Sequence, residues 1–189
     1  RISMILQDPK FSLNPVMRVG EQIAEARQAA RPGTPAEARA CALDMLEQVR
    51  IRDPRRVFDL YPHEVSGGMG QRVMIAMMLV GEPELLIADE PTSALDVTVR
   101  TQVLAILDDL VARRGLGLIF IIHDLNLVAT FCDRVLIMYA GHIVEECRAA
   151  ELHNARHAYT QGLLASLPRI NQRRPRLEVL NRDPAWLSG

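Results

Sequence analysis

Two adjacent carboxylates, Asp89 and Glu90, directly follow the apolar run Leu85–Ala88. A short run that is apolar throughout predicts a buried parallel strand, and open α/β sheets bind ligands beyond the C-terminal ends of their strands. Two acids at that place can divide the work of a nucleotide hydrolase. The first holds Mg²⁺, and the second accepts a proton from the attacking water. The alternative is structural, because acids and a proline such as Pro91 also favour the first turn of a helix.

A glycine-rich turn, Ser66–Gly68, stands before a second apolar run, Val73–Val80. Serine is a favoured N-cap, and glycines let backbone N–H groups come close to an anion. The following helix directs the positive end of its dipole to the same point, so the pattern predicts a phosphate site. The alternative is a glycine hinge ahead of a buried helix.

Two further polar residues follow predicted strands. Gln7 comes directly after the apolar run Ile2–Leu6, and His123 comes directly after Leu118–Ile122, which is short and typical of a central strand. Because parallel strands end at the same edge of a sheet, both residues are placed where a ligand binds. Taken singly, a residue such as Gln7 is more often an ordinary loop residue, and one such as His123 is more often a packed polar residue than a catalyst.

The rest of the chain supplies helices and one hairpin. Thr34–Glu37 has the form of a capping box, and Asp96 is placed to cap a helix that ends near Gly115. We expect Arg72, at the start of a buried helix, to form an ion pair. Residues 20–80 form a helical insertion between two strands. The expected elements are helices over 20–30, 34–49, 53–61, 71–80 and 96–114, and a hairpin over 134–146 that turns at Gly141.

These motifs, in this order, resemble those of ABC transporter ATPases. The Q-loop, signature motif, Walker B motif, D-loop and H-loop correspond to Gln7–Pro9, Val65–Arg72, Leu85–Glu90, Ser93–Asp96 and Ile121–Asp124. A narrower likeness, to the ATP-binding subunits of oligopeptide and dipeptide importers, rests on Ser12–Pro15 and Tyr159–Leu164. The resemblance covers about residues 1–168.

The resemblance implies an α/β fold, a partial ABC-type nucleotide-binding domain with a RecA-like parallel sheet core. This domain would cover residues 1–148, with a helical subdomain at about 15–80. Residues 149–189 would form a C-terminal helical extension and tail of the peptide-importer type. From Pro168 onward the sequence is rich in arginine and proline, which is typical of a solvated tail.

The resemblance also implies a role for each motif residue. The substrate would be ATP, bound with Mg²⁺ and shared between two subunits. The implied catalytic residues are Glu90, His123 and Gln7, the nucleotide-binding residues are Ser66, Gly67, Gly68 and Asp96, and the Mg²⁺ ligands are Asp89 and Gln7.

One motif of the family is missing from the sequence. A Walker A loop reads GxxxxGK[ST], whereas the single lysine, Lys10, follows no glycine-rich loop. We therefore expect that the chain lacks the N-terminal third of the domain. The complete subunit is expected to hydrolyse ATP, and the 189-residue chain alone is expected to be inactive.

Composition limits the classes of partner. The net charge is −1, so no global field attracts nucleic acid or anionic lipid. The longest apolar run, Val73–Val80, is far below the roughly 20 residues that span a bilayer, so a link to a membrane is expected to be peripheral. The three cysteines form no CxxC pair, which suits a reducing compartment better than a disulfide or zinc framework.

The resemblance places the subunit at the cytoplasmic face of the bacterial inner membrane. Its implied partners are a second ABC ATPase subunit, integral-membrane permease subunits and, indirectly, a solute-binding protein, with no nucleic acid. Two alternatives stay open. One is a soluble ABC ATPase that acts on DNA or ribosomes, although such proteins commonly carry a long coiled coil or a second cassette. The other is a non-catalytic fragment that supplies a signature motif to a partner.

Overall fold

The computed structural model of the chain describes residues 1–7, 12–93, 95–167 and 186. The chain forms two compact units, Arg1–Ile121 and Ile122–Gly189, and each is described on its own. The boundary between the units falls directly after a strand. The boundary that the sequence analysis draws between residues 148 and 149 concerns family domains, and it stays a prediction.

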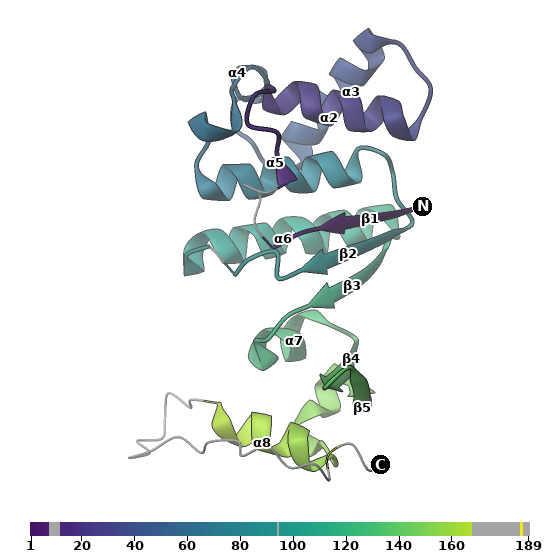
Figure 1. Cartoon of the computed structure of the whole chain (residues 1–189), viewed down its shortest axis with the longest axis vertical. Coiled ribbons are helices and arrows are strands. Elements are labelled where there is room, and N and C mark those ends of the chain that lie inside the picture. Colours follow the sequence, from purple (N-terminus) through teal and green to yellow (C-terminus); the bar gives the residue numbers. More distant parts are fainter. Residues whose placement is uncertain (8–11, 94, 168–185, 187–189) are drawn as a thin grey trace. The chain divides into compact units, whose positions relative to one another are not determined.

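Three parallel strands form the sheet of the first unit (Figure 1). They are β1 (Ile2–Ile5), β2 (Leu85–Asp89) and β3 (Gly117–Ile121), in the order β1-β2-β3. All three strands were predicted from their apolar runs. The prediction that β3 is central was wrong for the part of the chain that the structure describes, because there β2 pairs on both sides and β3 pairs with β2.

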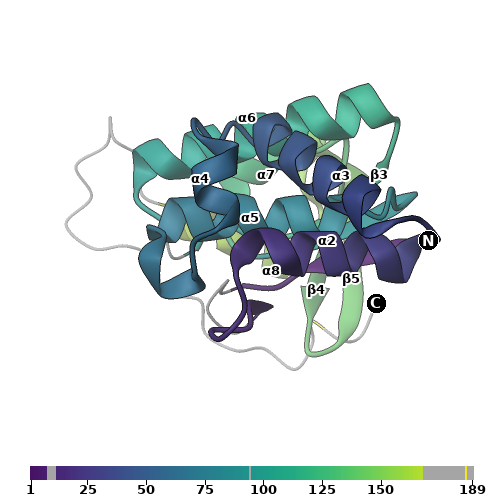
Figure 2. The ribbon, with the colours of Figure 1, turned by 90° about the horizontal axis from the view of Figure 1, so that it is seen from above.

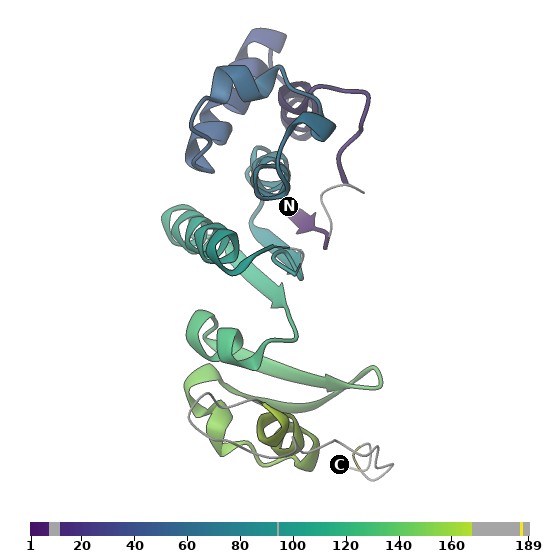
Figure 3. The same cartoon turned by 90° about the vertical axis from the view of Figure 1, so that its left-hand side faces the viewer.

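One face of this sheet is covered by helices. Ile5, Leu86 and Ala88 are fully buried on that face, under α5 (Gly67–Leu79) and α6 (Val97–Arg114) (Figure 3). Side chains alternate between the faces of a strand, so the neighbouring residues point the other way. There the apolar side chains stay largely exposed, at 67% for Ile2, 41% for Met4, 48% for Ile119 and 47% for Ile121.

Helix α6 begins and ends where the sequence predicts, whereas α5 begins at Gly67, directly after its expected cap Ser66 and four residues before the predicted start at residue 71. Ser66 caps α5, since its hydroxyl accepts a hydrogen bond from the Met69 N–H at 3.4 Å. Asp96 caps α6 in the same way through the Val99 N–H, and α6 ends at Gly115 in the left-handed conformation that glycine favours. Most of α5 is buried, which explains why it is apolar nearly all round.

Within the helical insertion, the first two helices pack on α5. Helices α2 (Val19–Ala30) and α3 (Pro35–Gln48) lie side by side and both contact α5 (Figure 2). The predicted capping box of Thr34 and Glu37 is present, and backbone and side-chain hydrogen bonds with Thr34 lower the pKa of the Glu37 carboxyl. The insertion continues through α4 (Pro54–Phe58) and a 3₁₀ turn (Pro62–Glu64).

Helix α4 is shorter than predicted. It ends at Phe58 and not near Tyr61. The N–H groups of Asp59 and Leu60 bond three residues back, and Tyr61 is already extended, at φ −88° and ψ 160°. An extended residue is favoured before proline, and Pro62 follows.

The second unit is built on an antiparallel hairpin. Strands β4 (Arg134–Tyr139) and β5 (His142–Arg148) meet at Ala140 and Gly141, whose φ angles of 47° and 84° are those of a tight hairpin turn. The hairpin packs on α7 (Leu125–Phe131), the 3₁₀ segment η2 (Ala149–Asn154) and α8 (Ala158–Ser166). Its core consists of Leu125, Val128, Val135, Ile137, Ala149 and Leu152.

Three aromatic rings cluster in the second unit. The rings of Tyr139 and Tyr159 lie 4.7 Å apart between centroids, and Trp186 lies 5.3 Å and 5.2 Å from them. Apart from Trp186, the predicted tail from residue 168 onward lies outside the described residues. Within the described part of the chain, no helix has the length and apolar character that a membrane crossing needs.

Candidate functional site

The structure brings Gln7 and Glu90 into contact. The Gln7 Nε2 atom donates a hydrogen bond of 3.0 Å to Glu90 Oε2, although the two residues are 83 positions apart. The contact arises because β1 and β2 are parallel neighbours, so the residues that follow them leave the sheet at the same edge. The Glu90 N–H also donates to the Ile121 carbonyl at 2.9 Å, which ties the ends of β2 and β3 together.

Glu90 has a strained backbone. Its φ angle is +43°, in the left-handed region that glycine occupies easily and glutamate does not. Such a conformation costs about 1–3 kcal/mol and persists only where neighbouring bonds hold it. Ser93 supplies two of them, since its N–H and its hydroxyl both donate to the Glu90 carbonyl, at 3.2 Å and 3.1 Å. Strain of this kind is common at active sites.

Asp89 is the last residue of β2 and is half-buried. Its carboxylate and the side-chain carbonyl of Gln7 are oxygen donors, which Mg²⁺ prefers. Among the described residues, no group of three or more His, Cys, Asp or Glu side chains is arranged to hold a metal ion by itself. This donor set fits Mg²⁺ bound with a nucleotide, because that ion usually takes one or two carboxylates together with phosphate oxygens and waters.

The predicted phosphate turn lies at the exposed N-terminus of α5. Ser66 and Gly67 are exposed, and a Cβ atom on Gly67 would meet nothing within 4 Å. The first turn of a helix carries N–H groups without partners in the helix, so this end can bind an anion. Gly68 differs from Gly67, because it is half-buried against Val99 of α6.

Asp96 serves as a helix cap in this structure. Its carboxylate accepts the Val99 N–H at 3.0 Å, and the residue is exposed. Ala94 of the same predicted D-loop lies outside the described residues. The nucleotide-binding role of Asp96 stays a prediction.

His123 lies two residues beyond β3 and belongs to the second unit. It is exposed, and the next residue, Asp124, caps α7 by accepting the N–H groups of Asn126 and Leu127. The approach of His123 to Glu90 stays a prediction, since the two residues belong to different units.

Arg72 holds the start of α5 in a way that differs from the prediction. Its guanidinium donates to the carbonyl of Gly68 at 3.1 Å and to that of Arg50 at 3.0 Å, whereas an acidic partner was expected. Burial, together with the positive charge of Arg52, lowers the pKa of Arg72. Within the described part of the chain, Arg72 stabilises the turn Ser66–Gly68, which we call the signature turn, by linking its Gly68 carbonyl to that of Arg50.

Sequence reasoning missed Gln22, which supports the loop after the Q-loop. Gln22 is 5% exposed, and its amide donates to the carbonyls of Asn14 and Met17 and accepts the Asn14 N–H. The loop itself faces solvent, with Val16 79% exposed. The polar residue at position 22, next to Ile23 on the apolar side of a helix, was the available signal.

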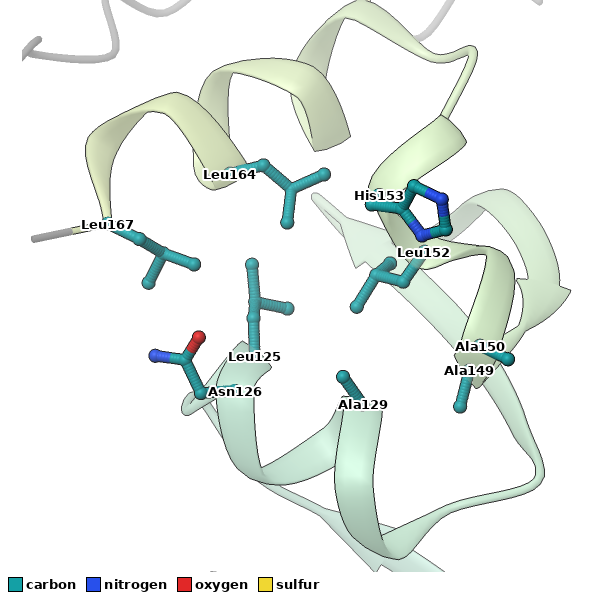
Figure 4. A pocket seen from close by; sticks show the side chains of 9 residues that line it. All are labelled: Leu125, Asn126, Ala129, Ala149, Ala150, Leu152, His153, Leu164 and Leu167. Atoms are coloured by element: carbon teal, nitrogen blue, oxygen red, sulfur yellow. The ribbon is translucent and has the colours of Figure 1, made fainter. Parts of the chain in front are cut away.

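The second unit contains a pocket of about 260 Å³ (Figure 4). Its walls are nearly all aliphatic, and Asn126 and His153 are its polar members. His153 belongs to η2, and His157 caps α8 because its Nδ1 atom accepts the Tyr159 N–H at 3.2 Å. The lining is given by Leu125, Asn126, Ala129, Ala149, Ala150, Leu152, His153, Leu164 and Leu167.

The chain is similar in sequence to known proteins. Residues 1–93 match the sequence model of the family described as ABC transporter. The chain is 52% identical over 185 residues to a probable peptide ABC transporter ATP-binding protein of Sinorhizobium fredii. It is 48% identical over 180 residues to the dipeptide transport ATP-binding protein DppD of Escherichia coli. The alignments take in 97% and 95% of this chain, but the chain spans only 55% of the length of either relative.

Solved structures agree with this result. The dimeric ATP-binding cassette MJ0796, in a post-hydrolysis state with ADP and phosphate bound, gives a TM-score of 0.69 at 27% identity, over 79% of this chain and 63% of that chain. The cbiO1 protein of Clostridium perfringens, part of the transporter complex cbiONQ, gives 0.70 at 28% identity, over 81% and 59%. The fold class expected from the motifs is confirmed.

Proposed function

We propose that the chain belongs to the ABC transporter family of ATP-binding proteins and is part of a subunit that hydrolyses ATP to drive the import of peptides or related small solutes. The observation that carries the proposal is the hydrogen bond between Gln7 and Glu90 at the carboxyl edge of the parallel sheet. The names of the relatives, which specify peptide and dipeptide transport, support the choice of cargo.

Glu90 is the proposed general base. The Gln7 amide binds its Oε2 atom, and the left-handed backbone sets the direction in which the side chain leaves the strand. A carboxylate restricted in this way is positioned to take a proton from the water that attacks the γ-phosphate. His123 would help to orient that water.

Asp89 and the carbonyl oxygen of Gln7 would hold Mg²⁺, which supplies positive charge against the phosphate oxygens. The amide of Gln7 is suited to both tasks, because its Nε2 donates to Glu90 while its carbonyl oxygen is an acceptor. Gln7 thereby links the metal ligand to the base.

The turn Ser66–Gly68 would bind the γ-phosphate of a nucleotide held by a second ATPase subunit. The exposed serine, the open space at Gly67 and the helix N-terminus support this role. Asp96 would lie in the same interface. The nucleotide would thus join two subunits, and hydrolysis would release them.

The partners would be permease subunits in the membrane and, through them, a solute-binding protein, with no nucleic acid. The subunit would be peripheral, at the cytoplasmic face of the bacterial inner membrane. The loop around Val16 is exposed and is held by hydrogen bonds from the Gln22 amide, so it is suited to contact with a permease. The likeness to cbiO1, a component of a transporter complex, is consistent with such an assembly.

The test is Glu90→Gln in the complete subunit, assembled with its permease. We expect ATP turnover and peptide uptake to fall about 10²–10⁴-fold, while dimerisation driven by Mg-ATP persists, because the amide keeps the shape but takes no proton. Glu84→Gln is the matched control, since Glu84 precedes the same strand at its opposite end and is exposed. Unchanged turnover in Glu90→Gln would refute the role of the base.

A further inference from the structure

The Val99 side chain occupies the space that a side chain at position 68 would need. A Cβ atom built on Gly68 would lie 2.5 Å from Val99 Cγ1, closer than real Cβ contacts allow, whereas one on Gly67 would meet nothing within 4 Å. The two glycines of the signature turn therefore differ in purpose. Gly67 keeps the surface open, and Gly68 lets a neighbouring helix come close.

Both sides of this contact are held in place. The Val99 N–H is bound by the Asp96 carboxylate, which fixes the first turn of α6. The Gly68 carbonyl is bound by Arg72 Nε, which fixes the first turn of α5. Helices α5 and α6 pack against each other (Figure 3). Because packed side chains transmit strain, a change of volume at Val99 moves the signature turn.

The contact between Gly68 and Val99 also places the signature turn against the helix that follows Asp89 and Glu90, the acid pair, in the chain. Helix α6 follows the loop that starts at Ser93, and the Ser93 hydroxyl donates to the Glu90 carbonyl at 3.1 Å. Ser93, which is bonded to Glu90, precedes the cap of α6 by three positions, and Val99 in the first turn of that helix contacts Gly68.

We propose that Val99 is a positioning residue, whose side chain sets the spacing between the signature turn and the helix that follows the acid pair. The proposal rests on the proposed function for the task of that turn. Val99 acts through Gly68 and has no contact with nucleotide. A change in the volume of the Val99 side chain therefore alters kcat at saturating ATP and leaves KM for ATP unchanged.

The test compares Gly68→Ala, Val99→Ala and the double variant in the complete subunit within its transporter. Gly68→Ala lowers kcat at least about tenfold, because its methyl group collides with Val99. Adding Val99→Ala frees that space and restores about tenfold of the loss, which is a non-additive result of the kind that contacting residues give. A double variant as inactive as Gly68→Ala would overturn the proposal, since Gly68 would then serve phosphate approach alone.

Two controls separate positioning from stability. Gly67→Ala is not rescued by Val99→Ala, because the two side chains do not meet. Val99→Thr, which keeps the shape of the side chain, retains the wild-type kcat, whereas Val99→Ala alone lowers kcat. If Val99→Ala changed only the midpoint of thermal unfolding, the residue would be structural and the proposal wrong.

The same measurements distinguish this proposal from the proposed function. A wild-type transporter without ATP turnover refutes the proposed function, and the kinetic role of Val99 falls with it. An active wild type without rescue in the double variant refutes the role of Val99 and leaves the proposed function intact.

Discussion

The amide of Gln7 lies 3.0 Å from the carboxylate of Glu90, across two strands that are 83 positions apart in the chain. The bond joins the candidate metal ligand at the end of β1 to the candidate base at the end of β2. Since the two residues are bonded to each other, a substitution of Gln7 is expected to change the position of the Glu90 carboxylate.

Removing the Gln7 amide leaves the Glu90 carboxylate without this restraint. We expect Gln7→Ala to lower ATP turnover of the complete subunit about 10–100-fold, because a hydrogen bond to a charged group contributes about 1.5–3 kcal/mol. Steady-state phosphate release measures the effect. Gln28→Ala, on the exposed side of α2, is the control and keeps the wild-type rate. Equal rates in the two variants would mean that Gln7 does not orient the base.

The left-handed backbone of Glu90 predicts a conflict between stability and activity. Glu90→Gly and Glu90→Ala both lose the bond to Gln7 and should abolish ATP turnover, but the free energy of unfolding should be about 1 kcal/mol higher in Glu90→Gly, because only glycine adopts this conformation without strain. Urea denaturation and phosphate release measure the two effects. Ala140→Gly is the matched control, since Ala140 has a φ of 47° in the hairpin of the second unit. It should gain stability and keep activity, and a Glu90→Gly variant no more stable than Glu90→Ala would contradict the inference of strain.

Glu145 predicts the response of the second unit to acid. Burial raises the pKa of this carboxyl, but the neighbouring Thr160 hydroxyl, the backbone N–H groups of Arg156 and His157 and the charge of His157 outweigh it, so the pKa lies below its ordinary value of 4.5. The charged form is therefore favoured by folding. Its contribution to stability is complete above that ordinary value and is lost as the pH falls towards the folded pKa.

We expect Glu145→Gln to remove part of the decline in stability between about pH 5 and about pH 3, measured by urea denaturation at each pH. An identical acid profile in Glu145→Gln and the wild type would show that the carboxylate does not carry this dependence.

The 189-residue chain by itself should not turn over ATP. It contains no GxxxxGK[ST] loop, so it lacks the backbone cradle and the lysine that bind the β- and γ-phosphates. Calorimetric titration with Mg-ATP should give weak binding, and an ATPase assay should give no signal above a Glu90→Gln blank. Turnover that disappears in that blank would prove the expectation wrong.

Local features were predictable from the sequence because their causes lie within a few residues. Ser66, Thr34 and Asp96 each cap the helix that begins next to them, as their residue types indicate. The end of α4 was placed too late, because the bonds that close it at Asp59 and Leu60 have no distinct residue signature.

Features that depend on distant partners were not predictable. Among the described residues, Arg72 binds the carbonyl oxygens of Gly68 and Arg50, and a carbonyl is present at every position, so no residue type marks the partner. The position of β3 in the sheet depends on which strands pair with it. The positive φ of Glu90 also had no signal, since that conformation is typical of glycine or asparagine.

The sequence by itself determined the likeness to ABC transporter ATPases, the three strands of the first unit, the two acids after the second of them, and the capped turn, because apolar runs and cap residues act over short distances. Only the tertiary structure decided that Gln7 binds Glu90, that Glu90 is strained and that Gly68 makes room for Val99. Each of these depends on residues far apart in the chain that meet when strands pair and helices pack, and a linear pattern does not specify those distances.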